Sequence, residues 1–230
     1  MKYFFRFISI FASLFFVSSA FAADSSPATA AVDVKAPSGI ENNPLIKNAP
    51  LKTDFVLGKK DAKVTIVEYA SLSCSHCAAF ANDVLPEIEK KYIDTGAVRY
   101  VLRQFPLNEP AFGGAMLVDC VGKKDSAKYY LFAKVLFAEQ AKWAFDMSWK
   151  SGLEKFAAVG GVSKAEFEAC LADKDRESRV LQGKKEAMDE LKVPHTPFFY
   201  IDGEIYDGDR SFLEISKAIE AKLAKKIDKK

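Results

Sequence analysis

Two cysteines separated by two residues follow a run of strand-forming residues, and this arrangement constrains the fold more than any other feature of the chain. The run Val64–Ala70 is apolar on both alternating faces except at Glu68, which is typical of a strand buried on both sides of a sheet. Cys74-Ser75-His76-Cys77 comes next and opens a stretch with helical spacing. A second inner strand predicted at 97–105 completes a β-α-β unit with parallel strands.

The helix predicted between these two strands runs from Cys74 to about Tyr92. Its apolar residues recur at intervals of three or four positions: Cys77, Ala81, Val84, Ile88 and Tyr92. Pro86 lies inside this stretch and predicts a kink, because proline has no amide hydrogen to donate to the helix.

The sequence shows no convincing strand over 107–192, where we predict a block made only of helices. Apolar residues recur at helical spacing in four stretches of this block: 112–121, 126–140, 149–159 and 164–191. Strands resume at Phe198–Ile201, and Asp202-Gly203 predicts a two-residue hairpin turn into Glu204–Tyr206. Ser211 can cap a last helix that runs to about Lys225.

The N-terminal residues have the three parts of an export signal. Lys2 and Arg6 flank the start, 7–21 is almost wholly apolar, and Ala20-Phe21-Ala22 fits a cleavage site. We therefore predict a signal peptide over 1–22. An uncleaved membrane anchor is the alternative, because the apolar run approaches the roughly 20 residues that span a bilayer.

Residues 23–52 are predicted to form a flexible N-terminal arm, because they are rich in Ala, Ser, Asn and Pro and leave little room for continuous helix or strand. Without residues 1–22 the chain keeps 31 basic and 31 acidic residues. This balance gives no sign of a nucleic-acid partner, and none is expected.

The position of Cys74 at the start of a helix indicates redox chemistry. Unpaired amide donors and the helix dipole favour a thiolate there, so Cys74 is the candidate nucleophile, and a cationic His76 would favour the thiolate further. Cys77, one turn into the helix on its apolar side, is the candidate resolving thiol. Stabilising the thiolate stabilises the reduced protein, which makes the disulfide a stronger oxidant of other dithiols.

Two other interpretations of the motif are an inert stapling disulfide and half of a metal site. Zinc sites usually contain a second Cys or His pair at ligand spacing, whereas the sequence has one further histidine, His195. We therefore expect no bound metal and no other cofactor. The alternative from a different functional class is a protein that carries a thiophilic metal such as Cu(I) between Cys74 and Cys77.

Glu68 is expected to point toward the sheet end at which the Cys74 helix begins. A lone buried carboxyl has a raised pKa and can exchange a proton with a nearby thiol. The alternative is a wet strand end with a solvated Glu68.

Cys120 and Cys170 form a second cysteine pair. They lie in different predicted helices among apolar neighbours, and an oxidising compartment favours a structural disulfide between them. Two buried free thiols are the alternative.

The order of five features resembles the DsbA family of disulfide oxidoreductases, over about residues 53–226. These features are Glu68, Cys74-Ser75-His76-Cys77, Gln104-Phe105-Pro106, the helical block and Thr196-Pro197. The resemblance implies an α/β thioredoxin fold interrupted by an all-α helical insertion. The thioredoxin-fold domain would comprise 53–106 and 193–230, and the insertion would comprise 107–192.

The resemblance also implies a periplasmic enzyme that introduces disulfide bonds into exported proteins. A substrate thiolate attacks Cys74, and the second cysteine of the substrate then displaces it. A membrane quinone reductase similar to DsbB would reoxidise the enzyme. Pro197 would be cis and face the Cys74-Cys77 disulfide, and the backbone of Thr196 would pair with an extended substrate segment.

Two residues depart from the commonest family pattern. Ser75 stands where proline is usual, and Thr196 before the proline is a choice also seen in disulfide isomerases. An isomerase or a reductase of the same fold is therefore the alternative. Isomerases of this superfamily generally work as oligomers through an added domain, which residues 23–52 are too short to supply, so we expect a monomeric oxidase.

Overall fold

The computed structural model of the chain describes residues 40–123 and 125–227. The predicted signal peptide at 1–22, its alternative as an anchor, and residues 23–39 of the predicted arm lie outside the described residues. Within the described ranges, no helix combines the length and the apolar character needed to cross a membrane.

A five-stranded sheet forms the centre of the described chain, in the order β1-β3-β2-β4-β5. Its strands are β1 (Val56–Leu57), β2 (Val64–Ala70), β3 (Val98–Gln104), β4 (Phe198–Ile201) and β5 (Glu204–Tyr206). The predicted parallel pairing of the two inner strands is confirmed by β2 and β3, and the other pairs are antiparallel. The short edge strand β1 was not predicted, because two residues carry no readable alternation.

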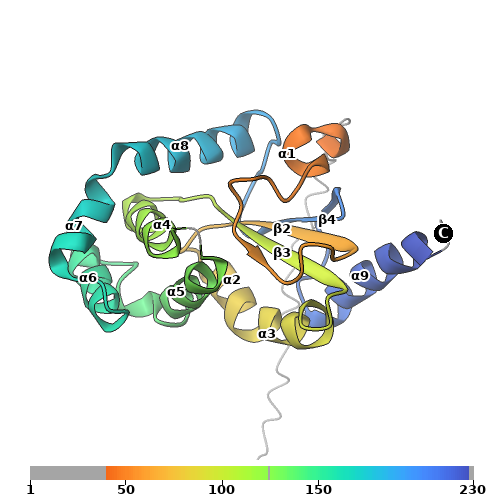
Figure 1. Cartoon of the computed structure of the whole chain (residues 1–230), viewed down its shortest axis with the longest axis horizontal. Coiled ribbons are helices and arrows are strands. Elements are labelled where there is room, and N and C mark those ends of the chain that lie inside the picture. The colour runs from red at the N-terminus through yellow and green to blue at the C-terminus, as the bar shows by residue number, and fades with distance from the viewer. Residues whose placement is uncertain (1–39, 124, 228–230) are drawn as a thin grey trace, which may run out of the picture. The chain divides into compact units, whose positions relative to one another are not determined.

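Both faces of β2 are buried along its whole length, as its apolar pattern predicts. Val64, Ile66 and Ala70 belong to the larger hydrophobic core. This core also contains residues of α2 (Ser75–Ala79), α3 (Leu85–Ile88) and α9 (Phe212–Ile227). Val67 and Tyr69 belong to a second core on the opposite face. Figure 1 shows the corresponding layers, with α8 (Lys174–Asp189) and α1 (Pro44–Lys47) above the sheet and α2, α3 and α9 below it.

The helical stretch after the cysteine motif is continuous but irregular. It consists of α2 (Ser75–Ala79), a π-helical segment at Phe80–Val84, α3 (Leu85–Ile88) and a second π-helical segment at Glu89–Ile93. Pro86 lies in the first turn of α3, where its missing amide hydrogen costs least. A kink is predicted at Pro86, and the structure has π-helical segments before and after the short helix that contains this proline.

Between β3 and β4 the chain is helical, as predicted. The elements are α4 (Glu109–Gly122), α5 (Ser126–Ala138), a 3₁₀ turn at Gln140–Lys142, α6 (Trp149–Val159), α7 (Lys164–Ala172) and α8 (Lys174–Asp189). One helix predicted over 164–191 is in fact two. Asp173 has an extended backbone (φ −70°, ψ 107°), and its side chain accepts a hydrogen bond from the Arg176 amide at 2.9 Å and caps α8.

The end of the predicted flexible arm differs from the expectation. Asn43 caps the short helix α1 (Pro44–Lys47) by accepting a hydrogen bond from the Leu45 amide at 2.9 Å. Ile40 and Ile46 are buried in the second core. This end of the arm is therefore packed against the domain. Burying the two isoleucine side chains is favourable enough to offset the conformational entropy that an unpacked arm would retain.

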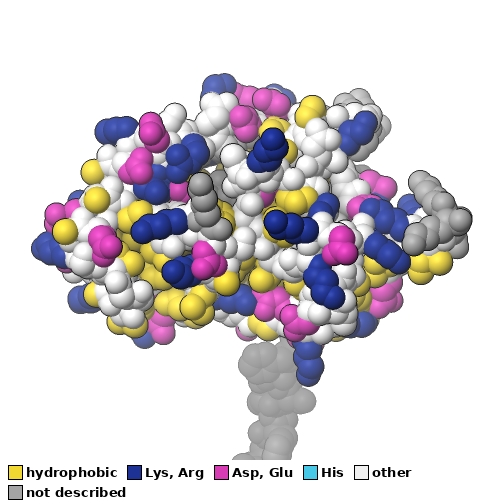
Figure 2. Space-filling model, viewed as in Figure 1, with side chains coloured by type: hydrophobic (Ala, Val, Ile, Leu, Met, Phe, Trp, Pro, Cys, Tyr) yellow, Lys and Arg dark blue, Asp and Glu magenta, His cyan; other side chains and the backbone are white. Residues whose placement is uncertain are grey.

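The C-terminal part follows the prediction closely. Asp202 and Gly203 both have positive φ, as a tight hairpin between β4 and β5 requires. The last helix, α9 (Phe212–Ile227), follows Ser211, whose hydroxyl accepts a hydrogen bond from the Glu214 amide at 3.4 Å. On the face shown in Figure 2, basic and acidic side chains are interspersed, in keeping with their nearly equal numbers.

Candidate active site

Cys74 occupies the cap position of α2, just beyond the end of β2. Its backbone is extended (φ −84°, ψ 121°), and no side chain caps the helix there. The amides of His76 and Cys77 donate toward the Cys74 sulfur instead. The sulfur is half-buried, so it can be reached by a protein substrate, whereas Cys77 is fully buried.

The surroundings of Cys74 lower the pKa of its thiol to about 5. The largest cause is a hydrogen bond with the Cys77 side chain, which outweighs the opposing effect of partial burial. The side chain of Thr196 and the amides of Cys77 and His76 add to the lowering. Cys74 is therefore mainly a thiolate at neutral pH.

Cys77 has the opposite character. Burial is the main cause that raises the pKa of its thiol, and the hydrogen bond to Cys74 and the negative charge of Glu68 raise it further. The dithiol form thus contains one stable thiolate and one thiol that holds its proton.

The loop before β4 lies directly against Cys74. The Cys74 Sγ donates a hydrogen bond to the main-chain oxygen of Thr196 at 3.3 Å, and the Thr196-Pro197 peptide bond is cis. With Cys74 protonated, the buried hydroxyl of Thr196 has no hydrogen-bond partner. On ionisation of Cys74 this hydroxyl can donate to the thiolate, which is consistent with the contribution of Thr196 to the lowered pKa.

Glu68 is buried beneath the motif and receives a hydrogen bond from the hydroxyl of Tyr100. Burial raises the pKa of Glu68 to about 8, and the Cys74 charge adds to this effect. The hydrogen bond from Tyr100 and the charge of Arg210 act in the opposite direction. Glu68 therefore holds a proton at neutral pH, and the alternative of a solvated carboxylate at a wet strand end is wrong.

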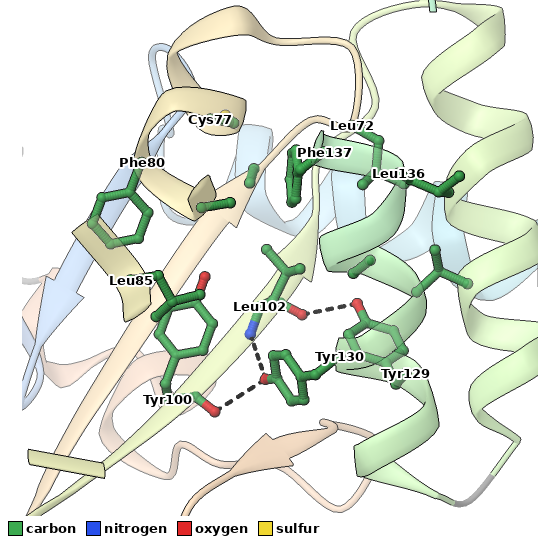
Figure 3. Close-up of a cluster of buried hydrophobic side chains, with 14 of the residues drawn as sticks. Leu72, Cys77, Phe80, Leu85, Tyr100, Leu102, Tyr129, Tyr130, Leu136 and Phe137 are labelled. Atoms are coloured by element: carbon green, nitrogen blue, oxygen red, sulfur yellow. Dashed lines mark hydrogen bonds between the residues drawn. The ribbon is translucent and has the colours of Figure 1, made fainter. Parts of the chain in front are cut away.

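Figure 3 shows how the side chains below the motif are arranged. Tyr100 points from β3 toward the helical stretch that carries Cys77 and Phe80. The hydroxyl of Tyr130 accepts a hydrogen bond from the Leu102 amide at 3.0 Å and donates one to the Tyr100 carbonyl at 3.0 Å (Figure 3). The backbone of β3 is thus held by α5 while the phenol of Tyr100 remains available to Glu68.

His76 is exposed at the first turn of α2. Its amide is among the groups that lower the pKa of Cys74. The structure therefore places His76 at the surface next to the nucleophile. Its contribution to the lowered pKa of Cys74 comes from its backbone amide.

Gln140 is a site residue that sequence reasoning missed. Its buried side-chain amide donates to the carbonyl oxygens of Leu72 at 2.8 Å and Cys74 at 3.0 Å. The hydroxyl of Ser71 supports the same loop, accepting from the amides of Ser73 at 3.4 Å and Leu107 at 3.3 Å. These contacts fix the backbone that carries Cys74, and nothing in their local sequence indicates them.

The second cysteine pair joins two helices of the insertion. Cys120 on α4 and Cys170 on α7 are disulfide-bonded, with their Cα atoms 5.7 Å apart. Cys74 and Cys77 are both free thiols, so the structure represents the dithiol form of the motif. Within the described residues, no group of three or more Cys, His, Asp or Glu side chains is placed to hold a metal ion.

The sequence and fold of the chain are similar to those of known proteins over most of its length. A family model described as Thioredoxin matches residues 51–221. The structure of alpha-DsbA1 from Wolbachia pipientis superimposes with a TM-score of 0.73 and 30% identity, covering 78% of this chain and 96% of that one. The chain belongs to the DsbA family of thioredoxin-fold proteins.

Two curated relatives agree with this assignment. A protein of Rickettsia bellii that carries the name protein-disulfide oxidoreductase is 32% identical over 189 residues, 79% of this chain and 72% of the relative. Disulfide bond formation protein D of Bacillus subtilis is 26% identical over 80% of this chain and 81% of its own length. The protein is accordingly a thiol:disulfide oxidoreductase of the DsbA type, as the sequence features predict.

Proposed function

We propose that this DsbA-type protein works as an oxidase, which donates its Cys74-Cys77 disulfide to cysteine pairs of exported proteins. The observation that carries the proposal is the contrast between the two thiols. Cys74 has a pKa of about 5, so the reduced protein is stabilised by its thiolate. A stable reduced form makes the disulfide a strong oxidant.

The proposed reaction begins from the disulfide form. A substrate thiolate attacks the half-buried sulfur of Cys74, a bond forms between these two sulfurs, and Cys77 leaves with the electron pair of the broken bond. Because Cys77 favours the protonated state, it takes a proton, and buried Glu68 is placed to supply it. The second substrate thiolate then attacks the substrate sulfur of the mixed disulfide, and Cys74 leaves as a stable thiolate.

The proposed substrate-binding site is the loop of Thr196 and Pro197. The main-chain oxygen of Thr196 lies beside the Cys74 sulfur that the substrate attacks, where an extended peptide can pair with the backbone that leads into β4. The segment after Gln140 supplies the exposed side chains of Phe145 and Met147, and Leu107 is exposed beside Ser71. Apolar side chains at these positions suit unfolded chains that have not yet buried their own core.

The predicted signal peptide supports a periplasmic location for this proposed reaction. The proposed partners are newly exported proteins with cysteine pairs and a DsbB-like membrane quinone reductase, which accepts the two electrons from the dithiol and restores the disulfide. The proposed protein acts as a monomer, and the Cys120-Cys170 disulfide is proposed to be structural.

Trapping in periplasmic extracts tests the proposal. In Cys77→Ala, no Cys77 thiol is present to attack the mixed disulfide and release the bound protein. We therefore expect mixed disulfides between Cys74 and exported proteins to accumulate. Cys74→Ala is the matched control and should give none. Mixed disulfides confined to already folded proteins with wrongly paired cysteines would instead indicate an isomerase, and a purified protein holding stoichiometric Cu(I) would indicate metal carriage.

A further inference from the structure

The partner of the buried carboxyl is a phenol from the neighbouring strand. Tyr100 is 2% exposed, and its hydroxyl donates a hydrogen bond to Oε2 of Glu68. In the parallel register of β2 and β3, Glu68 pairs with Leu102, two residues beyond Tyr100. Glu68 and Tyr100 therefore project from the same face of the sheet, beneath the helical stretch that begins at Cys74.

Five groups with titratable or charged side chains face Glu68 from the surrounding elements. They are Tyr100 from β3, Cys74 and Cys77 from the start of α2, Tyr130 from α5, and Arg210 from the segment after β5. Among the described residues, the hydrogen bond to this carboxyl comes from the neutral Tyr100 hydroxyl, and Arg210 acts only through its charge. A neutral donor stabilises the carboxylate without neutralising it, so Glu68 can take up and release a proton.

We propose that Tyr100 is a positioning residue for proton exchange, which holds Oε2 of Glu68 and leaves Oε1 to exchange a proton with Cys77. The inference rests on the proposed proton exchange by Glu68. When the Cys74-Cys77 bond breaks, the Cys77 sulfur receives the electron pair and takes the proton from the Glu68 carboxyl. The new carboxylate then accepts the hydrogen bond from Tyr100, which keeps its own proton. During reoxidation the ionised form of Glu68 accepts the proton from Cys77 as Cys77 forms the disulfide.

Removing only the hydroxyl tests this role. In Tyr100→Phe the ring still fills the core, but the carboxylate of Glu68 loses its donor. A hydrogen bond to a charged group is worth enough to move the Glu68 titration up by about one pH unit. The titration is followed in the dithiol form by NMR of labelled glutamate carboxyl carbons, with Glu68→Gln used to assign the signal.

A second readout is the pH dependence of the reaction itself. Oxidation of the dithiol by oxidised glutathione requires Cys77 to lose its proton, so the rate should rise with pH as Glu68 ionises. In Tyr100→Phe this rise should move to higher pH by the same amount as the NMR titration. In a Glu68→Gln background, Tyr100→Phe should change the profile no further.

Tyr130→Phe is the matched control. It removes another buried tyrosine hydroxyl of the same core, one that bonds to the backbone of Phe55, Tyr100 and Leu102 and not to Glu68. Tyr130→Phe should lower the melting temperature and leave the pH at which Glu68 titrates unchanged. Equal shifts in Tyr100→Phe and Tyr130→Phe, or a Tyr100→Phe effect that persists in the Glu68→Gln background, would overturn the proposal.

Different results would contradict the proton exchange by Glu68 and the positioning role of Tyr100. If Glu68→Gln leaves the reoxidation profile unchanged, the proton exchange by Glu68 is wrong, whatever Tyr100 does to its titration. If Glu68→Gln changes the profile but Tyr100→Phe moves neither readout, only the role of Tyr100 is wrong. Should Tyr100→Phe not fold, 3-fluorotyrosine at position 100, a stronger donor of the same size, should move the Glu68 titration to lower pH, and no movement would overturn the role.

Discussion

The sulfur of Cys74 lies 3.3 Å from the main-chain oxygen of Thr196, the residue before the cis proline. This contact joins the head of α2 to the start of β4, two segments separated by the whole helical insertion. It brings the nucleophile and a hydroxyl that can donate to the thiolate next to the backbone that leads into β4. A substrate peptide paired with that backbone would present its cysteine to the sulfur of Cys74.

Replacing the hydroxyl of Thr196 should make Cys74 less acidic. Thr196→Val keeps the shape of the side chain and the main-chain contact, but removes the donor that helps to lower the Cys74 pKa. We expect this pKa to rise by about one pH unit, as measured by the pH dependence of alkylation of Cys74. Thr196→Ser retains a hydroxyl and serves as the control. Equal Cys74 titrations in the two variants would show that the hydroxyl is not involved.

The dithiol and disulfide forms should respond differently to pH. The Cys74 pKa is about 5 in the folded dithiol form against 9.0 for an ordinary thiol. Between these values the unfolded chain holds a proton that the folded chain has released, so the free energy of unfolding of the dithiol form rises with pH. This gain is complete above pH 9 and is lost as the pH falls through 5. The disulfide form has no such titration.

Glu68 acts in the opposite direction. Its pKa is about 8 in the folded protein against 4.5 unperturbed, so it contributes a loss of stability as the pH rises from 4.5 to 8. Burial, the main cause of the raised Glu68 pKa, is common to both forms, so the difference between their melting temperatures depends mainly on Cys74. We expect the Tm of the dithiol form minus that of the disulfide form to increase from pH 5 to pH 9. A difference independent of pH would contradict the lowered pKa of Cys74.

The second disulfide should contribute to stability and not to the reaction. Cys120 and Cys170 close a loop of 50 residues, for which chain entropy gives a stabilisation of about 4 kcal/mol. Replacing both with serine should lower the urea midpoint accordingly while dithiol oxidation continues. Loss of oxidase activity in a folded double variant would contradict a purely structural role for the Cys120-Cys170 disulfide.

Gln140 should be needed to hold the catalytic loop. Gln140→Leu leaves the buried carbonyl groups of Leu72 and Cys74 without this donor, which should cost about 2 kcal/mol in urea unfolding. The reaction of Cys74 with a model peptide should slow as the loop loosens. Gln182→Leu, which replaces an exposed glutamine on α8, is the control and should cost less than about 0.5 kcal/mol. Equal losses in both variants would contradict a specific role for Gln140.

The sequence predicts those parts of the site whose signals are local. The apolar residues on both faces of Val64–Ala70 predict a strand buried on both sides, and Glu68 stands out in it as the one charged residue. The spacing of Cys74 and Cys77 at a helix start indicates a nucleophile and a shielded partner. Each of these inferences needs only a few neighbouring residues and the geometry of one element.

Contacts between distant elements are not readable in this way. Tyr100 reaches Glu68 only because of the register between β2 and β3, and one apolar strand gives no register. Gln140 reaches Cys74 across the insertion from a short 3₁₀ turn. Asp173 did carry a local signal, because Asp is one of the residues favoured at the N-terminal cap of a helix. The helical repeat continues through this residue, however, and predicted one long helix.

The redox equilibrium of the Cys74-Cys77 pair with glutathione is the most direct test of the proposed oxidase. The fraction of the dithiol form is measured over buffers of defined ratios of reduced to oxidised glutathione, with Cys120→Ser/Cys170→Ser as the background in which only one pair can react. We expect a reduction potential far more oxidising than the roughly −270 mV of thioredoxin, because the Cys74 thiolate stabilises the reduced form. A potential at or below the thioredoxin value would contradict disulfide donation and indicate a reductase.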